Sequence, residues 1–285
     1  MSQGRYLIIN ADDFGMSHST NKAILKLFKE GFVTSTSLMP TCPWFKEAIT
    51  LCEEYKEIDV GVHLTFTSEW KYYKWRPLTT NKSVYSLVNE EGYLPASSKE
   101  VEKNAGRKEI KEEVKNQINI FYHNQVVPTS IDNHMGSLYG LVTGRSFLDI
   151  VFDFCQKHNL PFRYPVNIDN IRRENVSPEV IKGHEKIIQL AAQKDISLID
   201  YLISLERAKD YNSLKKIMIN KLKDLKEGIT EIYLHPAIAN EELKSITDNW
   251  QQRQFEFELL LDDDIKNIIK KENINLISWS EVTKI

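Results

Sequence analysis

Cysteine is scarce in this chain of 285 residues, which contains only Cys42, Cys52 and Cys155. An odd number of cysteines without a Cys-x-x-Cys spacing argues against a disulfide framework and against a thiolate zinc site. We therefore expect three reduced cysteines in the core.

Long apolar runs and an excess of one charge are also absent. No apolar stretch could span a bilayer, and the run before Asn10 is too short for a signal peptide. The 37 basic and 40 acidic residues leave a net charge of -3, which does not favour nucleic acid or a membrane surface as a partner. We therefore expect a cytoplasmic protein that acts on a small neutral or weakly charged substrate.

Strand-like and helix-like segments alternate along the chain without a break in composition. The spacing predicts strands at 7–9, 33–38, 58–64, 128–132, 162–166, 198–203, 230–234 and 274–279. Between them it predicts helices, among them 147–154, 178–193, 214–225 and 255–271. This alternation indicates an α/β fold, a TIM-barrel-like (β/α) barrel formed by a single domain over residues 1–285.

An irregular insert of about residues 65–103 follows the third predicted strand. So long an insert in a compact domain is typical of a lid or a binding loop. Trp70, Tyr72, Tyr73 and Trp75 lie close together in it and could form a stacking surface for a sugar ring. The same rings could equally pack the insert onto itself or form a subunit contact, which leaves a homodimer open.

Two adjacent carboxylates, Asp12 and Asp13, come directly after the apolar run Leu7-Ile8-Ile9. Neighbouring carboxylates repel each other, so a place near the interior requires a cation or a catalytic proton. The alternative is a solvated turn in which Asp13 caps the next helix.

Other polar residues also stand at the ends of predicted strands: His63, Asp132, His134 and His235. Arg163 lies within the predicted strand at 162–166. In a barrel these ends share one face, so we expect the side chains to converge on one pocket. A carboxylate with two imidazoles is a typical donor set of a catalytic divalent metal. Taken singly, His63 could be a core histidine and His134 a turn histidine.

Four motifs in order, NADDFGMS at 10–17, GVHL at 61–64, DNH at 132–134 and LHP at 234–236, resemble the YdjC family of carbohydrate deacetylases. That family includes the chitooligosaccharide deacetylases, and the resemblance covers nearly the whole chain. It implies a TIM-barrel-like deacetylase fold and removal of acetyl groups from N-acetylated sugars with a divalent metal, usually Mg²⁺.

The resemblance also implies roles for individual residues. Asp13, His63 and His134 would bind the metal, and Asp12 would be the general base. His235 would be the general acid or would position the substrate. In this scheme a metal-bound water attacks the acetamide, which fits the need of amide hydrolysis for an activated water and a proton donor.

Arg163 is a weaker correspondence, which could orient the catalytic acid, bind substrate or form a structural ion pair. Trp70 could shape the sugar subsite. Many family members have a further histidine where this chain has Gly136, so specificity for chitooligosaccharides does not carry over. Two imidazoles and one carboxylate also suit Zn²⁺ at least as well as Mg²⁺.

Two other kinds of function remain open at this point. One is another metal-dependent hydrolase, a phosphoesterase or an amidohydrolase, although the chain has no His-x-His motif and few cations for a phosphate. The other is a catalytically inactive sugar-binding barrel. The retained acid pair and histidines favour the deacetylase.

Overall fold

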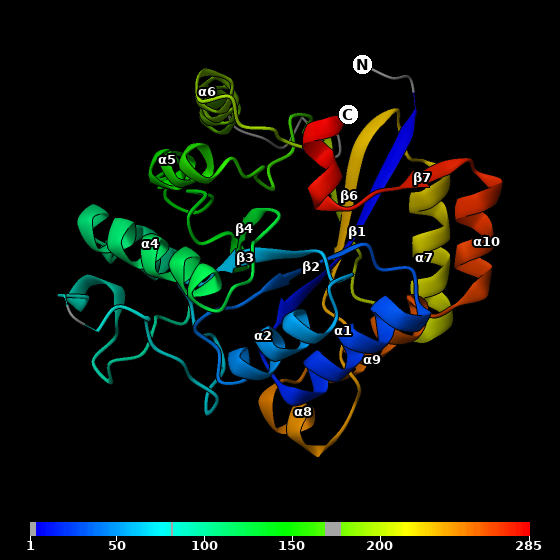
Figure 1. The fold of residues 1–285 in the computed structure, drawn as a ribbon, viewed down its shortest axis with the longest axis horizontal. Helices are drawn as coiled ribbons and strands as arrows, with labels where there is room; N and C mark the ends of the chain where they lie inside the picture. The colour runs from blue at the N-terminus through cyan, green and yellow to red at the C-terminus, as the bar shows by residue number, and fades with distance from the viewer. Residues whose placement is uncertain (1–3, 81, 169–177) are drawn as a thin grey trace.

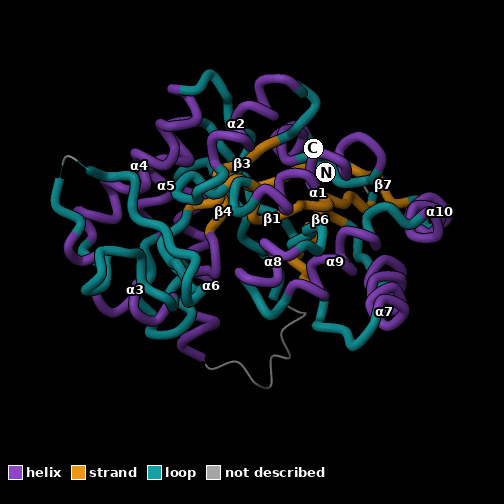
Figure 2. The backbone as a smooth tube through the Cα atoms, turned by 90° about the horizontal axis from the view of Figure 1, so that it is seen from below, coloured by secondary structure: helices purple, strands orange, loops and turns teal. Residues whose placement is uncertain are grey.

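The computed structural model describes residues 4–80, 82–168 and 178–285 and contains a parallel sheet in the order β4-β3-β2-β1-β6-β5, with β7 paired to β1. Its strands are β1 (Arg5–Phe14), β2 (Ser35–Leu38), β3 (Val60–Leu64), β4 (Ile131–Asn133), β5 (Tyr201–Ser204), β6 (Gly228–Leu234) and β7 (Ile274–Leu276). Figure 2 shows these strands in the middle of the molecule with helices around them. The predicted α/β class is confirmed.

The segment 161–167 connects the two edges of this sheet. On one side Ile131 of β4 pairs with Phe162, and on the other Pro165 pairs with Ile199, just before β5. The Arg163 N–H donates to the Ile131 carbonyl at 3.0 Å, which supports the first of these contacts. Isolated bridges therefore complete the barrel at this point. The continuous strand predicted at 162–166 does not form.

The helices lie around the sheet (Figure 1). They are α1 (His18–Glu30), α2 (Phe45–Glu54), α3 (Ser98–Asn104), α4 (Arg107–His123), α5 (Leu148–His158), α6 (Pro178–Gln193), α7 (Tyr211–Lys223), α8 (Glu241–Ile246), α9 (Trp250–Leu259) and α10 (Asp263–Lys271). The single helix predicted at 255–271 was wrong. Asp262 accepts a hydrogen bond from the Asp264 N–H and starts α10 as a separate helix.

The strands form from apolar runs because parallel strands are covered on both faces. In β1 the side chains from Leu7 to Phe14 are all buried. The helix that follows begins at Ser17, whose side chain accepts a hydrogen bond from the Thr20 N–H, and it ends at Gly31. Both boundaries match the sequence pattern. The three cysteines are free and buried, as expected.

The insert after β3 is mostly irregular, with a short 3-10 turn at Tyr85–Leu87, but α3 begins at Ser98 and shortens it. Ser97 and Glu100 form a capping box there, a local signal for a helix start. The Glu113 carboxylate accepts hydrogen bonds from the N–H groups of Leu78 and Thr79 and so ties the insert to α4. None of the described helices is long and apolar enough to cross a membrane.

Candidate functional site

The two adjacent acids at the end of β1 face different partners. The pairing of β1 with β2 shifts register between Ala11 and Phe14, and Asp13 has a φ of 68°. In a regular strand neighbouring side chains point to opposite faces, whereas this irregular end brings both carboxylates into one site. Each of them is buried.

Asp12 is held in a dense set of hydrogen bonds. Arg163 donates from Nη1 to Oδ2 and from Nη2 to Oδ1, both at 2.7 Å. Asn10 and Ser37 donate to Oδ1 at 2.7 and 3.1 Å. Burial acts to raise the pKa of Asp12, but the Arg163 guanidinium and His63 outweigh it and hold the pKa well below its usual range. Asp12 is therefore an ionised carboxylate in a fixed orientation.

Asp13 lies between two histidines. Its Oδ1 atom is 3.6 Å from His63 Nε2 and 3.4 Å from His134 Nδ1. This oxygen is buried and has no hydrogen-bond partner among the described residues, while Oδ2 accepts from Arg253 Nη2 at 2.7 Å. Ligand atoms from Asp13, His63 and His134 lie within 4.8 Å of one another. An unpartnered carboxylate oxygen facing two ring nitrogens is the arrangement that a divalent cation satisfies.

Ligand atoms of a second set also lie within 4.8 Å of one another. They come from Asp12, His63 and Asp132. In that set both carboxylates are already engaged. Arg163 Nη2 lies 2.7 Å from Asp12 Oδ1 and 2.8 Å from Asp132 Oδ2, and Asp132 Oδ1 lies 2.6 Å from His63 Nδ1. The set with Asp13 is therefore the better candidate for the metal.

Carboxylates orient both candidate imidazole ligands. Asp132 contacts His63 on the nitrogen that points away from Asp13, and Glu69 of the insert lies 3.1 Å from His134 Nε2. Burial acts to lower the pKa of His134, but Glu69 and Asp13 raise it to about 10. A carboxylate behind a ligating histidine fixes its ring and its tautomer.

Arg163 links the carboxylates of the site to a buried acid of β6. Its Nε donates to both oxygens of Glu231 at 2.9 Å, and its other two nitrogens bind Asp12 and Asp132. Burial raises the pKa of Glu231 to about 7, despite the nearby guanidinium. Because every nitrogen of Arg163 has a carboxylate partner, these contacts favour the ion-pair alternative over a direct substrate contact.

His235 follows β6 and is half-buried. Glu256 of α9 accepts a hydrogen bond from its backbone N–H at 2.6 Å. Its side chain is within electrostatic range of the two acids and contributes to the lowered pKa values of Asp12 and Asp13. The structure thus brings His235 to the predicted site.

The aromatic residues of the insert divide into two groups. Tyr72 is 83% exposed, whereas Trp70, Tyr73 and Trp75 contact one another. The Trp75 ring lies 6.4 Å from that of His134, and the Trp70 ring lies 5.7 Å from the Arg253 guanidinium carbon. These rings therefore pack the insert onto itself, and two of them also border the candidate metal site.

Gly136 lies two residues after His134 and has a φ of +60°. A β-carbon at this position would lie 3.2 Å from Leu141 Cδ1. A histidine here would therefore be strained.

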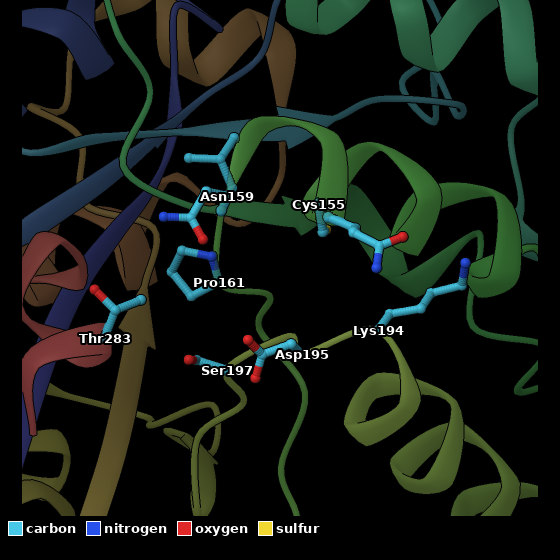
Figure 3. A pocket seen from close by; sticks show the side chains of 9 residues that line it. Cys155, Asn159, Pro161, Lys194, Asp195, Ser197 and Thr283 are labelled. Atoms are coloured by element: carbon cyan, nitrogen blue, oxygen red, sulfur yellow. The ribbon is translucent and has the colours of Figure 1, made fainter.

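The cavity in Figure 3 lies elsewhere. It has a volume of about 190 Å³ and is lined by residues such as Asn159, Pro161, Asp195 and Ser197. These residues lie at the start of the segment 161–167 and before β5, whereas Asp13, His63 and His235 stand at the other ends of their strands. The cavity contains none of the predicted site residues.

Three groups of the site were not predicted from the sequence: Glu69, Glu231 and Arg253. A single acid inside the apolar strand Ile229–Leu234 was a usable signal for Glu231. Glu69 lies in an irregular segment, and Arg253 lies on a helix with many polar residues. Neither of these two has a local signature.

Comparison with known proteins identifies one family and relatives of similar length. The family model described as "YdjC-like protein" matches residues 6–271. A protein of Geobacillus stearothermophilus named "Carbohydrate deacetylase" is 30% identical over 283 residues, with 99% of each chain covered. One with the same name from Thermoanaerobacter pseudethanolicus is 29% identical over 276 residues, covering 97% of this chain and 98% of its own.

A crystal structure of an Enterococcus faecalis V583 protein, whose name refers to cellobiose-phosphate cleavage, is similar over 98% of both chains. It has a TM-score of 0.80 and 26% sequence identity. The similarity extends over the barrel and its insert together.

Proposed function

This chain belongs to the YdjC-like protein family, and we propose that it is a metal-dependent hydrolase that removes the acetyl group from an N-acetylated sugar or oligosaccharide. The observation that carries the proposal is the unpartnered Asp13 Oδ1 between His63 and His134. The relatives named carbohydrate deacetylase support the reaction class. The conclusion is that the chain is an enzyme of this hydrolase class.

Asp13, His63 and His134 would hold the cation, with the nitrogens fixed by Asp132 and Glu69. When bound, a divalent cation in such a site lowers the pKa of a coordinated water and polarises the acetyl carbonyl. Two imidazoles and one carboxylate suit Zn²⁺, whereas Mg²⁺ prefers an all-oxygen shell. The resemblance to the family favours Mg²⁺, so both ions are candidates.

Asp12 is the proposed general base. It remains ionised at neutral pH because Arg163 holds its pKa low, and it can therefore accept the proton of the attacking water. Asn10 and Ser37 keep the carboxylate in one orientation. His235 is the proposed general acid, which would donate a proton to the departing amine of the sugar.

The substrate is proposed to be a small carbohydrate, bound beneath the insert. Trp70 offers a half-buried ring beside the metal-ligand set, and aromatic rings pack well against sugar rings. Phosphorylated disaccharides belong in the set to be tested, because the name of the similar Enterococcus faecalis protein refers to such a compound.

Acetate release tests this proposal directly. We expect purified protein to release acetate from at least one member of a panel of N-acetylated monosaccharides, oligosaccharides and their phosphates. A chelator should abolish the release, and Mg²⁺ or Zn²⁺ should restore it. No acetate from any compound, with the cation shown to be bound, would contradict a deacetylase and leave the sugar-binding barrel.

A further inference from the structure

Two buried arginines contact the acid pair, and they differ in how many of their guanidinium nitrogens have hydrogen-bond partners. All three nitrogens of Arg163 bind carboxylates. Arg253 uses only Nη2, which donates to Asp13 Oδ2 at 2.7 Å. Its Nε and Nη1 atoms are buried and have no hydrogen-bond partner within the described part of the chain. The site therefore contains a half-satisfied guanidinium directly beside a metal ligand.

The surroundings of Arg253 place it between the site and the insert. It comes from α9, at the lower end of the view in Figure 1 near α8 and α1. The ring of Trp70 covers its guanidinium, with 5.7 Å between the carbon and the ring centroid. Trp70 in turn packs edge-on against Trp75, with ring centroids 5.5 Å apart. A ligand that reached Asp13 from beneath the insert would meet both residues.

Buried N–H groups without acceptors are unfavourable, and native proteins leave few of them. A guanidinium satisfied on one side only has donors left for the acceptor oxygens of a ligand. A sugar supplies hydroxyl and carbonyl oxygens at its edge and an apolar face for an aromatic ring. Arg253 and Trp70 together match these two requirements.

We propose that Arg253 is a substrate-binding residue, whose Nε and Nη1 donate to oxygen atoms of the N-acetyl sugar while Nη2 holds Asp13. Trp70 packs against the same sugar ring. This inference rests on the proposed function and deepens it, because it assigns a specificity residue to α9. One guanidinium then connects the sugar with the carboxylate that faces the metal, so the acetyl group is positioned relative to the ion.

The test measures sugar binding separately from metal binding. In an Asp12→Asn background, which leaves the sugar intact, an N-acetylglucosamine trimer is titrated calorimetrically into Zn²⁺-loaded protein. Adding Arg253→Lys keeps the positive charge but removes the planar set of donors. We expect the dissociation constant of the trimer to rise by about tenfold or more, while the dissociation constant of Zn²⁺ changes by less than about threefold.

Two further variants make the result specific. Arg107→Lys alters an exposed arginine in an ion pair with Asp149 and should leave trimer binding unchanged. Trp70→Leu changes a half-buried residue of the irregular insert and should weaken trimer binding as Arg253→Lys does. It provides the test if the arginine variant does not fold.

The outcomes separate the inference from the proposed function. Unchanged trimer binding in both Arg253→Lys and Trp70→Leu would overturn the inference, as would absence of binding to the Asp12→Asn parent. A loss of Zn²⁺ affinity that accounts for the whole loss of trimer affinity would also overturn it, because Arg253 would then only hold Asp13. If trimer binding depends on Arg253 but unmodified protein releases no acetate, the inference stands and the deacetylase proposal fails.

Discussion

The Nδ1 atom of His63 lies 2.6 Å from Oδ1 of Asp132, and the Nε2 atom of the same ring faces Asp13. The carboxylate thus selects the nitrogen that is available to a cation. Neighbouring strands create this arrangement, because His63 of β3 and Asp132 of β4 are directly paired in the sheet. The orientation of this proposed metal ligand is therefore set by strand register.

Removal of this carboxylate should weaken metal binding. We expect Asp132→Ala to reduce the affinity for the divalent cation by about 10- to 100-fold, as is typical when the partner of a ligating histidine is lost. Metal titration of chelator-treated protein measures the effect. Asp149→Ala, which removes an acid with a 49% exposed side chain, is the control and should bind metal normally. Equal affinities in the two variants would contradict the role of Asp132.

Loss of the proposed base should separate binding from turnover. Asp12→Asn keeps the shape of the side chain but cannot accept a proton, so we expect acetate release to fall by about 10²- to 10⁴-fold. Metal content should stay near that of the unmodified protein, because Asp13 and the two histidines are unchanged. Parallel measurements of metal content and acetate release check this. Turnover at the unmodified rate would remove Asp12 from the mechanism.

The metal-free protein should become less stable as the pH rises. Burial opposes the charge on His134, but Glu69 and Asp13 raise its pKa from the ordinary histidine value of 6.5 to about 10. Protonation therefore stabilises the fold fully below about pH 6.5, and this contribution is lost as the pH rises towards about 10. Thermal unfolding of chelator-treated protein between these pH values should show a falling Tm. His134→Gln should make Tm depend less steeply on pH. If Tm fell as steeply in this variant, the pH dependence would come from other groups.

Arg163 should contribute strongly to stability. Arg163→Leu would leave Asp12, Asp132 and Glu231 buried without their shared cation, and removing one partner of a buried ion pair costs about 3–5 kcal/mol. Chemical denaturation measures the change. Arg107→Leu breaks an exposed ion pair and should cost less than about 1 kcal/mol. Similar losses in both variants would mean that the buried carboxylates take up protons at little cost.

The close approach of β3 to the chain before β4 should make Gly61 sensitive to substitution. A β-carbon there would lie 2.3 Å from Ser130 Oγ and 3.2 Å from its carbonyl oxygen. We expect Gly61→Ala to lower the free energy of unfolding by about 1–3 kcal/mol. Adding Ser130→Ala should recover part of this loss because it removes the nearer atom. If the double variant were as unstable as the sum of the single ones, the contact would not be the cause.

The sequence predicted the structure best where burial or the chemistry of the site requires a particular type of residue at a position. Parallel strands covered on both faces appear as short apolar runs, so β3 and β6 were placed closely. The first strand was predicted too short, because β1 continues through the two acids to Phe14. Chemically distinctive residues at strand ends then predicted a shared polar pocket. The family resemblance selected Asp13, His63 and His134 from it, and the structure brings these three together.

Other features depend on contacts that no local pattern encodes. Arg253 meets Asp13 across 240 positions of the chain, and it stands in a run of polar residues at the start of its helix, which has no distinctive spacing. Glu69 acts through its place in the insert rather than through a motif. The segment 161–167 is recognised only from its partners on each side, because it has isolated bridges in place of a regular strand.

The same segment carries Arg163, one residue after its contact with Ile131. The stretch that bridges the two edges of the sheet therefore also delivers the group that fixes Asp12. A partly assembled chain would lack an oriented base even if the first four strands were in place. Enzymatic turnover would thus serve as a sensitive reporter of whether folding has run to completion.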